Sequence, residues 1–272
     1  MRLTSIHLYP VKSLGGHDVA EAVVERWGLR GDRRWLALNP DGTYLTARIE
    51  PRMLSLTAQA RSDGAITLRD GHGSLDVQPA PRGEIVPTAV SRLESVRLAA
   101  PEAHEWLSTR LGRELRLGWL DDPQRRSVAT DHGGHPGDPL NLADAGPLLL
   151  CTVQSMNRLN DWIADTALER GEDFEPLPIS RFRPTVVVDG AVEPFAEDDW
   201  KTVIIGGVEF RFAEACDRCA LTTIDTRTFR TAKEPIRTLA RFRQWDHKTF
   251  FGVRLVPVTT GVIRVGDEVS AA

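Results

Sequence analysis

The sequence predicts a mainly β protein of the α+β class, barrel-like and with a few helices. Two observations predict this fold. Short apolar runs bounded by turn residues recur along the chain, and only two longer segments show helical periodicity. The length of 272 residues allows one or two domains, and 41% hydrophobic and 26% charged residues are ordinary values for a globular protein.

Strand signals occur in six runs that alternate or are continuously apolar and that end at turn residues. These runs are residues 5–9, 35–38, 203–205, 208–212, 253–258 and 262–265. The third and fourth runs predict a β-hairpin, because Gly206 and Gly207 supply the positive φ that a two-residue hairpin turn requires. In that hairpin Val208, Phe210 and Phe212 are expected to face inward.

Two segments predict helices. Residues 101–111 begin with Pro101, which suits the first turn of a helix, and they end before Gly112. Thr152 is expected to cap a second, longer helix. The apolar face of that helix consists of Val153, Met156, Leu159, Trp162 and Ile163, which we interpret as core packing.

The chain is expected to divide at residues 121–138. This segment is rich in Pro, Gly, Arg and His, a composition that predicts a linker or long loop. The division gives an N-terminal domain of residues 1–120 and a C-terminal domain of residues 139–272.

Charge and composition exclude several classes of protein. The net charge is −4 and the pI is about 6.0, so nothing indicates a nucleic-acid partner. No stretch approaches the roughly 20 apolar residues of a membrane span, and the first residues contain no apolar signal-peptide core. We therefore expect a cytoplasmic protein with no membrane partner. The three cysteines argue against a disulfide framework and favour a reducing compartment.

Two of the cysteines, Cys216 and Cys219, follow the predicted hairpin as the string ACDRC. A zinc site needs four ligands, and the chain has no second pair of cysteines. A thioredoxin-like pair would open a helix, whereas residues 221–225 are rich in β-branched side chains and predict a strand. Two buried thiols, or a redox disulfide between them, are the remaining interpretations.

The string CDRCALTTID (216–225) resembles the metal-binding segment of the MOSC domain family. Eight further strings resemble others of that family and occur in the same order. They are LYPVKS (8–13), WGLRGDRRW (27–35), LTARIEPRM (45–53), RFRPTVVV (181–188), EDDW (197–200), KEP (233–235), FFGV (250–253) and IRVGDEV (263–269). The pattern is most similar to that of the mitochondrial amidoxime-reducing components and their bacterial counterparts. The resemblance implies a MOSC-type β-barrel preceded by a MOSC N-terminal β-barrel domain.

The resemblance also implies a molybdenum cofactor, molybdenum bound by molybdopterin, and roles for individual residues. Cys219 corresponds to the cysteine that binds molybdenum, and Arg218 lies beside the metal. A soft thiolate suits a metal that the pterin already holds through sulfur. Cys216 is expected to be a buried thiol near the site.

Further residues are implied as contacts to the pterin or its phosphate. In the N-terminal half these are Lys12, which offers an ammonium charge, Ser13, which adds a hydroxyl donor, and Arg33. Arg183 offers a planar guanidinium next to the rigid Pro184, and Thr185 stands where relatives usually carry Asn. Asp144, ahead of the second helix, corresponds to an acceptor for pterin nitrogens.

The implied activity is reduction of N-hydroxylated compounds, such as amidoximes and hydroxylamines, by a molybdenum-dependent oxidoreductase. The chain has too few cysteines for a [2Fe–2S] cluster and no glycine-rich dinucleotide motif, so we expect a separate electron-transfer protein as partner. The alternative is a carrier of sulfur or of the molybdenum cofactor. In that case Cys219 holds a persulfide formed without pyridoxal phosphate in this chain, or the chain delivers bound cofactor.

Overall fold

Strands dominate the secondary structure and three α-helices accompany them, so the predicted mainly β fold is confirmed. The computed structural model describes residues 1–272. The chain forms two compact units. The C-terminal unit comprises residues 1–7, 19–25 and 148–272, and the N-terminal unit comprises residues 8–18 and 26–147.

These units differ from the linear division that composition predicts. β1 (Arg2–Leu8) pairs antiparallel with β13 (Val186–Asp189), so the first strand of the chain completes a sheet of the C-terminal unit. β3 (Glu21–Glu25) likewise pairs with β18 (Gly261–Arg264). Such pairing between segments far apart in sequence depends on tertiary packing, and local sequence signals do not record it.

The large sheet has the strand order β19-β14-β15-β17-β12-β13-β1-β2, in which β2 is the short strand His17–Val19. Its other strands are β12 (Leu148–Thr152), β14 (Thr202–Ile205), β15 (Val208–Asp217), β17 (Lys248–Pro257) and β19 (Val269–Ala271), and β16 (Gln244–Trp245) pairs with β17. β12 and β13 run parallel, whereas β12 and β15 each pair antiparallel with β17.

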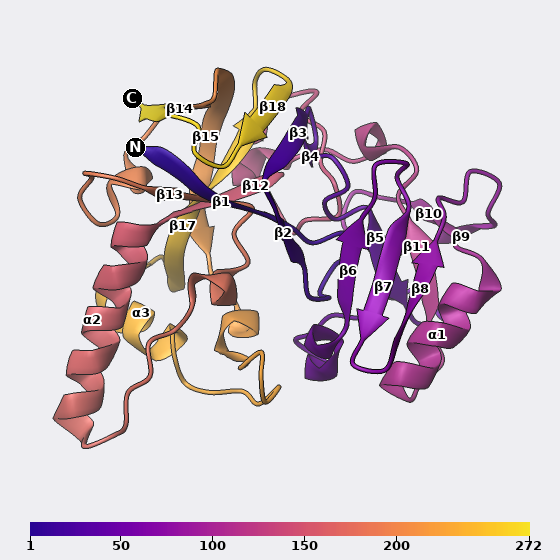
Figure 1. Cartoon of the computed structure of the whole chain (residues 1–272), viewed down its shortest axis with the longest axis horizontal. Coiled ribbons are helices and arrows are strands. Elements are labelled where there is room, and N and C mark those ends of the chain that lie inside the picture. The colour runs from indigo at the N-terminus through magenta and orange to yellow at the C-terminus, as the bar shows by residue number, and fades with distance from the viewer. The chain divides into compact units, whose positions relative to one another are not determined.

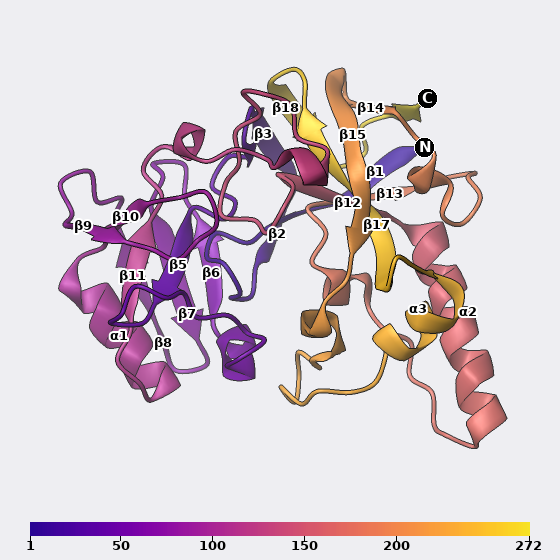
Figure 2. The same cartoon turned by 180° about the vertical axis from the view of Figure 1, so that it is seen from behind.

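The predicted hairpin is present. β14 and β15 pair around Gly206 and Gly207, whose φ angles are 54° and 86°. Val208 and Phe210 are buried as expected, and Phe212 is half-buried. β15 then continues to Asp217 beside β17 (Figure 2), so the sheet leads directly to the cysteine pair.

The long helix α2 (Val153–Arg170) begins at its predicted cap, where Thr152 Oγ1 accepts from the amide of Ser155. α3 (Ile236–Phe242) lies beside α2 (Figure 1). Met156, Leu159 and Ile163 of α2 pack into a buried cluster with Cys151, Phe182, Leu239 and Phe251, which confirms the core face of the helix. None of the three α-helices combines the length and the apolar character needed to cross a bilayer.

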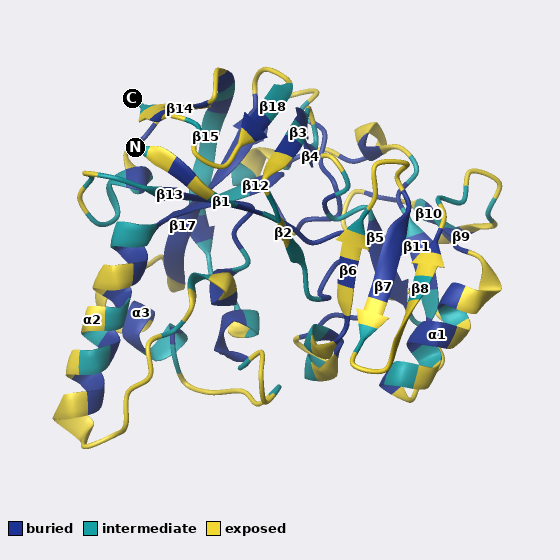
Figure 3. Cartoon of the chain, viewed as in Figure 1, coloured by how far each residue is buried: buried dark blue, intermediate teal, exposed yellow.

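The N-terminal unit contains two antiparallel sheets with the orders β5-β11-β10-β9 and β6-β7-β8. The strands of this unit before α1 are β4 (Gly28–Leu29), β5 (Trp35–Leu38), β6 (Thr57–Ala60), β7 (Ile66–Asp70), β8 (Gly73–Val77), β9 (Ile85–Pro87) and β10 (Ser95–Leu98), and β11 (Arg116–Trp119) follows α1. α1 (Pro101–Leu111) ends at Gly112, as predicted. Buried and exposed residues alternate along α1 and α2 (Figure 3), as expected of helices with one face in a core.

Residues 121–138 pack within the N-terminal unit. They contain the 3₁₀ helices η2 (Pro123–Arg125) and η3 (Thr130–His132). The amide of Val128 donates to the carbonyl of Asp138 at 3.0 Å, which closes the segment on itself. Arg126, between the two short helices, is only 3% exposed. The segment therefore contributes to the interior of the unit, which its polar composition does not indicate.

Candidate functional site

Cys219 lies just beyond the end of β15, where the sheet fixes the chain. The amide of Arg218 donates to the carbonyl of Thr249 at 2.7 Å and thereby extends the pairing of β15 with β17. All three cysteines are free thiols; Cys151 and Cys216 are buried, whereas Cys219 is partly accessible. Of the three cysteines, Cys219 is therefore the one that a ligand can reach.

The residues after Cys219 form the 3₁₀ helix η6 (Ala220–Thr223), and the expectation of a strand there is wrong. Thr222 Oγ1 donates to the carbonyl of Cys219 at 3.0 Å, and Thr223 Oγ1 donates to that of Ala220 at 2.7 Å. These hydroxyl bonds to the backbone stabilise a tight turn, and they outweigh the β propensity of threonine. The turn keeps Cys219 at the start of η6.

The guanidinium of Arg218 is held in place beside the cysteine pair. Its Nη1 atom donates to Cys216 Sγ at 2.8 Å, and its Nη2 atom donates to the carbonyl of Phe182 at 2.7 Å. The guanidinium carbon also lies 5.2 Å from the centre of the Phe182 ring. The Nε atom of Arg218 is buried and has no hydrogen-bond partner. A buried donor without a partner costs about 1–3 kcal/mol, so this atom suits an added acceptor.

The other thiols differ from Cys219 in their surroundings. Burial raises the pKa of the Cys151 thiol well above its usual range, so Cys151 stays protonated at neutral pH. Near Cys216, Arg254 pairs with Glu214 and, at 2.6 Å, with Asp217. Because burial and the Arg218 bond occupy Cys216, the accessible Cys219 is the better candidate for a metal ligand.

Arg183 follows the 3₁₀ helix η4 (Ile179–Phe182) and is half-buried. It adopts a left-handed backbone with φ of 57°, and its amide donates to the carbonyl of Ser180 at 3.0 Å. Because the neighbouring carbonyl of Phe182 accepts from Arg218, the segments that carry Arg183 and Arg218 are joined directly. The structure thus brings together the segments of two predicted cofactor-binding arginines, Arg183 and Arg218, and the segment of Cys219.

Thr185 is placed differently from its predicted role as a cofactor contact. Its side chain is fully buried, and its hydroxyl accepts from the amide of Leu149 at 2.7 Å and donates to the carbonyl of Leu149 at 3.0 Å. The hydroxyl therefore joins the starts of β12 and β13, and a contact with a ligand would require these bonds to break.

In the N-terminal unit, Lys12 and Ser13 lie in a turn after β1, which ends at Leu8. Lys12 is buried; its Nζ atom donates to the carbonyl of Leu142 at 2.9 Å and pairs with Asp144. Burial lowers the pKa of Lys12 most strongly, Asp144 opposes this effect, and nearby arginines lower the pKa further. Ser13 is buried and has φ of 70°.

Arg33 lies close to Lys12 in the same unit. Its Nη1 atom donates to Asp32 Oδ2 at 2.5 Å, and its guanidinium lies 4.8 Å from the centre of the Tyr9 ring. Burial acts to lower the pKa of Arg33, but the Asp32 carboxylate, with smaller contributions from Tyr9 and Asp144, outweighs burial and raises it. Ser13, Arg33 and Arg183 are three of the eight non-glycine residues with positive φ. Such strained backbone occurs preferentially at binding sites.

Asp144 pairs with Lys12 and leaves 57% of its side chain exposed. It precedes strand β12 rather than a helix. A second cation of this region, Arg126, has no counterpart among the predicted site residues. Its burial is the structural signal that marks it, and one arginine among the 34 basic residues of the chain gives none in the sequence.

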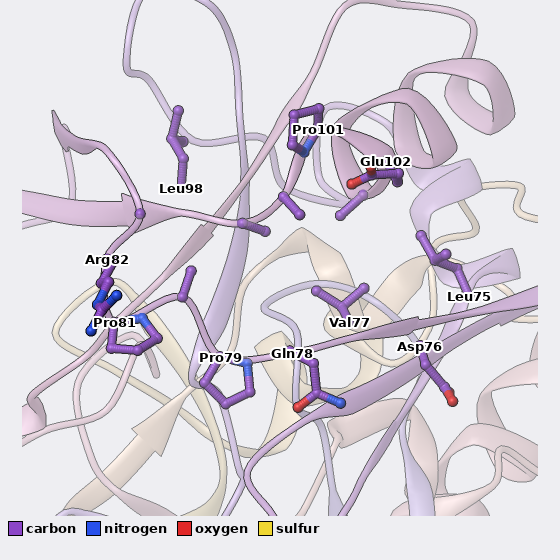
Figure 4. A pocket seen from close by; sticks show the side chains of 15 residues that line it. Leu75, Asp76, Val77, Gln78, Pro79, Pro81, Arg82, Leu98, Pro101 and Glu102 are labelled. Atoms are coloured by element: carbon purple, nitrogen blue, oxygen red, sulfur yellow. The ribbon is translucent and has the colours of Figure 1, made fainter.

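A cavity of about 610 Å³ lies elsewhere in the N-terminal unit, between β8, residues 78–83 and the start of α1 (Figure 4). Its walls are formed mainly by apolar groups of Leu75, Val77, Pro79, Pro81, Leu98 and Pro101. It contains none of the residues that the sequence singles out, so the candidate chemistry does not lie there.

The residues present fit a cofactor that brings its own sulfur ligands. No group of three or more His, Cys, Asp or Glu side chains is arranged to hold a metal ion, so a zinc site made only of protein ligands is not supported. In the C-terminal unit, one accessible thiol and a fixed guanidinium with an unused donor suit an anionic group whose metal needs one further ligand.

Comparison with known proteins gives the family. Residues 1–114 match the MOSC N-terminal beta barrel domain, and residues 137–270 match the MOSC domain. Mitochondrial amidoxime-reducing component 1 of Xenopus laevis is 32% identical over 290 residues, which cover 98% of this chain and 81% of that protein. The Homo sapiens protein of the same name is 31% identical over 288 residues, which cover 98% of this chain and 82% of that protein.

A second kind of relative is longer. Molybdenum cofactor sulfurase of Danio rerio is 29% identical over 272 residues, which cover 93% of this chain and 31% of that protein. Both matched domains and both kinds of relative confirm the family that the sequence motifs imply. The chain is similar to the mitochondrial amidoxime-reducing components over nearly its whole length, and it belongs to the MOSC domain family.

Proposed function

We propose that this chain is a molybdenum-cofactor-dependent reductase of N-hydroxylated compounds, such as amidoximes and hydroxylamines, and that a separate protein supplies its electrons. The observation that carries the proposal is the accessible Cys219, which directly follows Arg218, whose guanidinium is fixed on Cys216 and Phe182. The names of the amidoxime-reducing relatives support the substrate class.

In this proposal Cys219 provides the thiolate for molybdenum, and Arg218 and Arg183 contribute positive charge near the bound cofactor. Lys12, Ser13 and Arg33 are the proposed contacts to its phosphate or pterin, and Asp144 is a proposed acceptor that also pairs with Lys12. When bound, the cofactor supplies the exchange of two electrons and an oxygen atom. The overall reaction converts an N–OH group to N–H, consumes two electrons and two protons, and releases water.

The protein groups act by position and charge. Arg218 is anchored at Cys216 and Phe182, so its charge is held in one place without reorganisation during the reaction. Cys151 is buried and protonated and does not compete with Cys219 for the metal. The 272 residues contain three cysteines, so they do not themselves hold a four-cysteine iron–sulfur cluster, and electrons must come from another source.

The test is to purify the chain from a host that makes the cofactor and to measure molybdenum, pterin and turnover of benzamidoxime with reduced viologen dye. We expect equal amounts of metal and chain, and turnover that depends on the metal. Full molybdenum content without turnover of any N-hydroxylated compound would contradict the reductase proposal. Absence of both metal and pterin would contradict cofactor binding as well.

A carrier of sulfur or of cofactor is the second candidate, and the similarity to molybdenum cofactor sulfurase favours it. In that case Cys219 carries a persulfide, or the chain releases bound cofactor to an acceptor protein. The test is incubation with a donor persulfide, which passes its outer sulfur to Cys219 and is left as a thiol. A persulfide on Cys219, detected by mass spectrometry, distinguishes this function from that of a reductase.

A further inference from the structure

Arg126 binds the backbone of a short segment, residues 141–144, in the N-terminal unit. Its Nη1 atom donates to the carbonyls of Asn141 at 2.5 Å and Ala143 at 2.7 Å, and its Nη2 atom lies 3.4 Å from the carbonyl of Asp144. Its Nε atom donates to the carbonyl of Ser91 at 3.0 Å. These acceptors are neutral, so the bonds hold the backbone without cancelling the charge of Arg126.

The same segment holds Lys12. The carbonyl of Leu142 accepts from Lys12 Nζ, and the carboxylate of Asp144 pairs with it. Arg126 therefore binds the residues on both sides of Leu142, and also the backbone of Asp144. Leu142 and Asp144 provide the polar contacts of the Lys12 ammonium.

Arg33 depends on this segment too. The amide of Leu142 donates to the carbonyl of Arg33 at 2.8 Å. The side chain of Asn141 donates to the carbonyl of Asp32 at 3.3 Å, and Asp32 in turn accepts from Arg33. Residues 141–144 thus contact both candidate cations, Lys12 and Arg33. Arg126 holds the same residues in place through hydrogen bonds to their carbonyls.

We propose that Arg126 is a positioning residue, which orients Lys12 and Arg33 for an anionic ligand by holding residues 141–144. This inference rests on the proposed function in one respect, because it takes the ligand to be the anionic part of the cofactor. Electrostatics agree with the geometry. Burial, followed by repulsion from Arg92, lowers the pKa of Arg126 to about 10, and the charge of Arg126 in turn helps to lower the pKa of Lys12.

The test uses the reactivity of Lys12 itself. The chain has only four lysines, so acylation of each amine over a pH series can be followed by mass spectrometry with Lys201, Lys233 and Lys248 as internal references. The variants are Arg126→Gln, which removes the charge and the hydrogen bonds of the guanidinium to residues 141–144, and Arg126→Lys, which keeps the charge. Arg125→Gln is the matched control, since Arg125 is exposed and bonds to Asp121 and Ser95.

In Arg126→Gln we expect the pKa of Lys12 to rise, because Lys12 becomes less buried and a nearby positive charge is removed. The three reference lysines and the Arg125→Gln control should not move. Cofactor content should fall about tenfold in Arg126→Gln, the usual effect of losing a partner that orients a ligand-binding residue. If Arg126→Gln does not fold, Arg126→Lys should still show faster hydrogen exchange at residues 141–144 and lower cofactor content.

Two results would overturn the inference. One is a folded Arg126→Gln chain with wild-type labelling of Lys12, and the other is an Arg126→Lys chain with unchanged exchange at residues 141–144. The labelling and exchange measurements use the chain without cofactor. They therefore remain decisive if the chain binds no molybdenum cofactor and the proposed function fails.

Discussion

Arg218 donates from Nη1 to the Sγ atom of Cys216 at 2.8 Å, so the first cysteine of the pair anchors the arginine that precedes the second. The two cysteines consequently have different roles. Cys216 is a buried acceptor within β15, and Cys219 is an accessible thiol after the strand ends. Substitutions at the two positions should therefore give different results.

Cys219→Ser should abolish molybdenum binding and turnover, because a hard alcohol oxygen is a poor replacement for a soft thiolate. Cys216→Ser should retain most of both, since the serine hydroxyl still accepts from Arg218. The measurement is metal content by mass spectrometry together with viologen-dependent turnover. Equal losses in the two variants would instead indicate a paired role, such as a disulfide.

Arg183→Ala should reduce cofactor retention. Loss of one charge-assisted hydrogen bond costs about 1.5–3 kcal/mol, which corresponds to about a tenfold to hundredfold weaker affinity. Pterin released by oxidation and measured by fluorescence reports the retained cofactor. Arg227→Ala is the control, because the ion pair of Arg227 with Glu175 is exposed and contributes little to stability. Wild-type retention in Arg183→Ala would remove Arg183 from the site.

Thr185→Val should lower stability without a specific loss of cofactor. The substitution conserves shape but leaves the Leu149 amide without the hydroxyl acceptor that it has at 2.7 Å. An unsatisfied amide costs about 1–3 kcal/mol, which chemical denaturation should detect. The cofactor content of the folded fraction should equal that of the wild type. A specific loss of cofactor at unchanged stability would restore Thr185 as a ligand contact.

Lys12 should make cofactor retention sensitive to alkaline pH. Because burial lowers the pKa of Lys12 below its ordinary value of 10.5, the ammonium loses its charge earlier than an exposed lysine as pH rises. By contrast, the contribution of Lys12 to the free energy of unfolding of the cofactor-free chain should increase as pH rises. Between the lowered folded pKa and 10.5 the unfolded chain binds more protons, so the contribution of Lys12 to stability increases with pH. Lys12→Met should remove both dependences, and their persistence in that variant would contradict the assignment.

Turnover should require an electron donor outside these residues. The purified chain with NADH or NADPH alone should not reduce an N-hydroxylated substrate. Addition of a ferredoxin, flavodoxin or cytochrome with its reductase should restore turnover. Activity with the pyridine nucleotide alone would show that the expectation of a separate partner is wrong.

Elements with strong local signals could be predicted from the sequence. The Gly206-Gly207 turn, the Thr152 cap and Gly112 at the end of α1 each act within a few residues, and the structure has all three where they were predicted. The motif order gave the family for the same reason, since each motif is a short local string.

Features that depend on individual side-chain hydrogen bonds or on distant contacts could not be predicted. The hydroxyl bonds of Thr222 and Thr223 favour η6 over a strand, and Thr185 uses its hydroxyl on Leu149. Arg126 was missed because composition places it in a polar segment, while its importance comes from burial and from carbonyls of residues 141–144. Sequence periodicity records none of these partners.

The positive φ angles of Ser13, Arg33 and Arg183 have a consequence for engineering. A left-handed backbone costs a residue with a β-carbon about 1–2 kcal/mol, and glycine avoids that cost. Substitution by glycine at these positions would relieve the strain and at the same time remove a hydroxyl or a guanidinium. Arg33 is an exception, because glycine there would deprive the buried Asp32 carboxylate of the guanidinium that it pairs with, which costs more than the strain that is relieved. At Ser13 and Arg183, a search for thermostable variants that scores only the melting temperature would favour glycine and so remove side chains that are proposed to bind the cofactor.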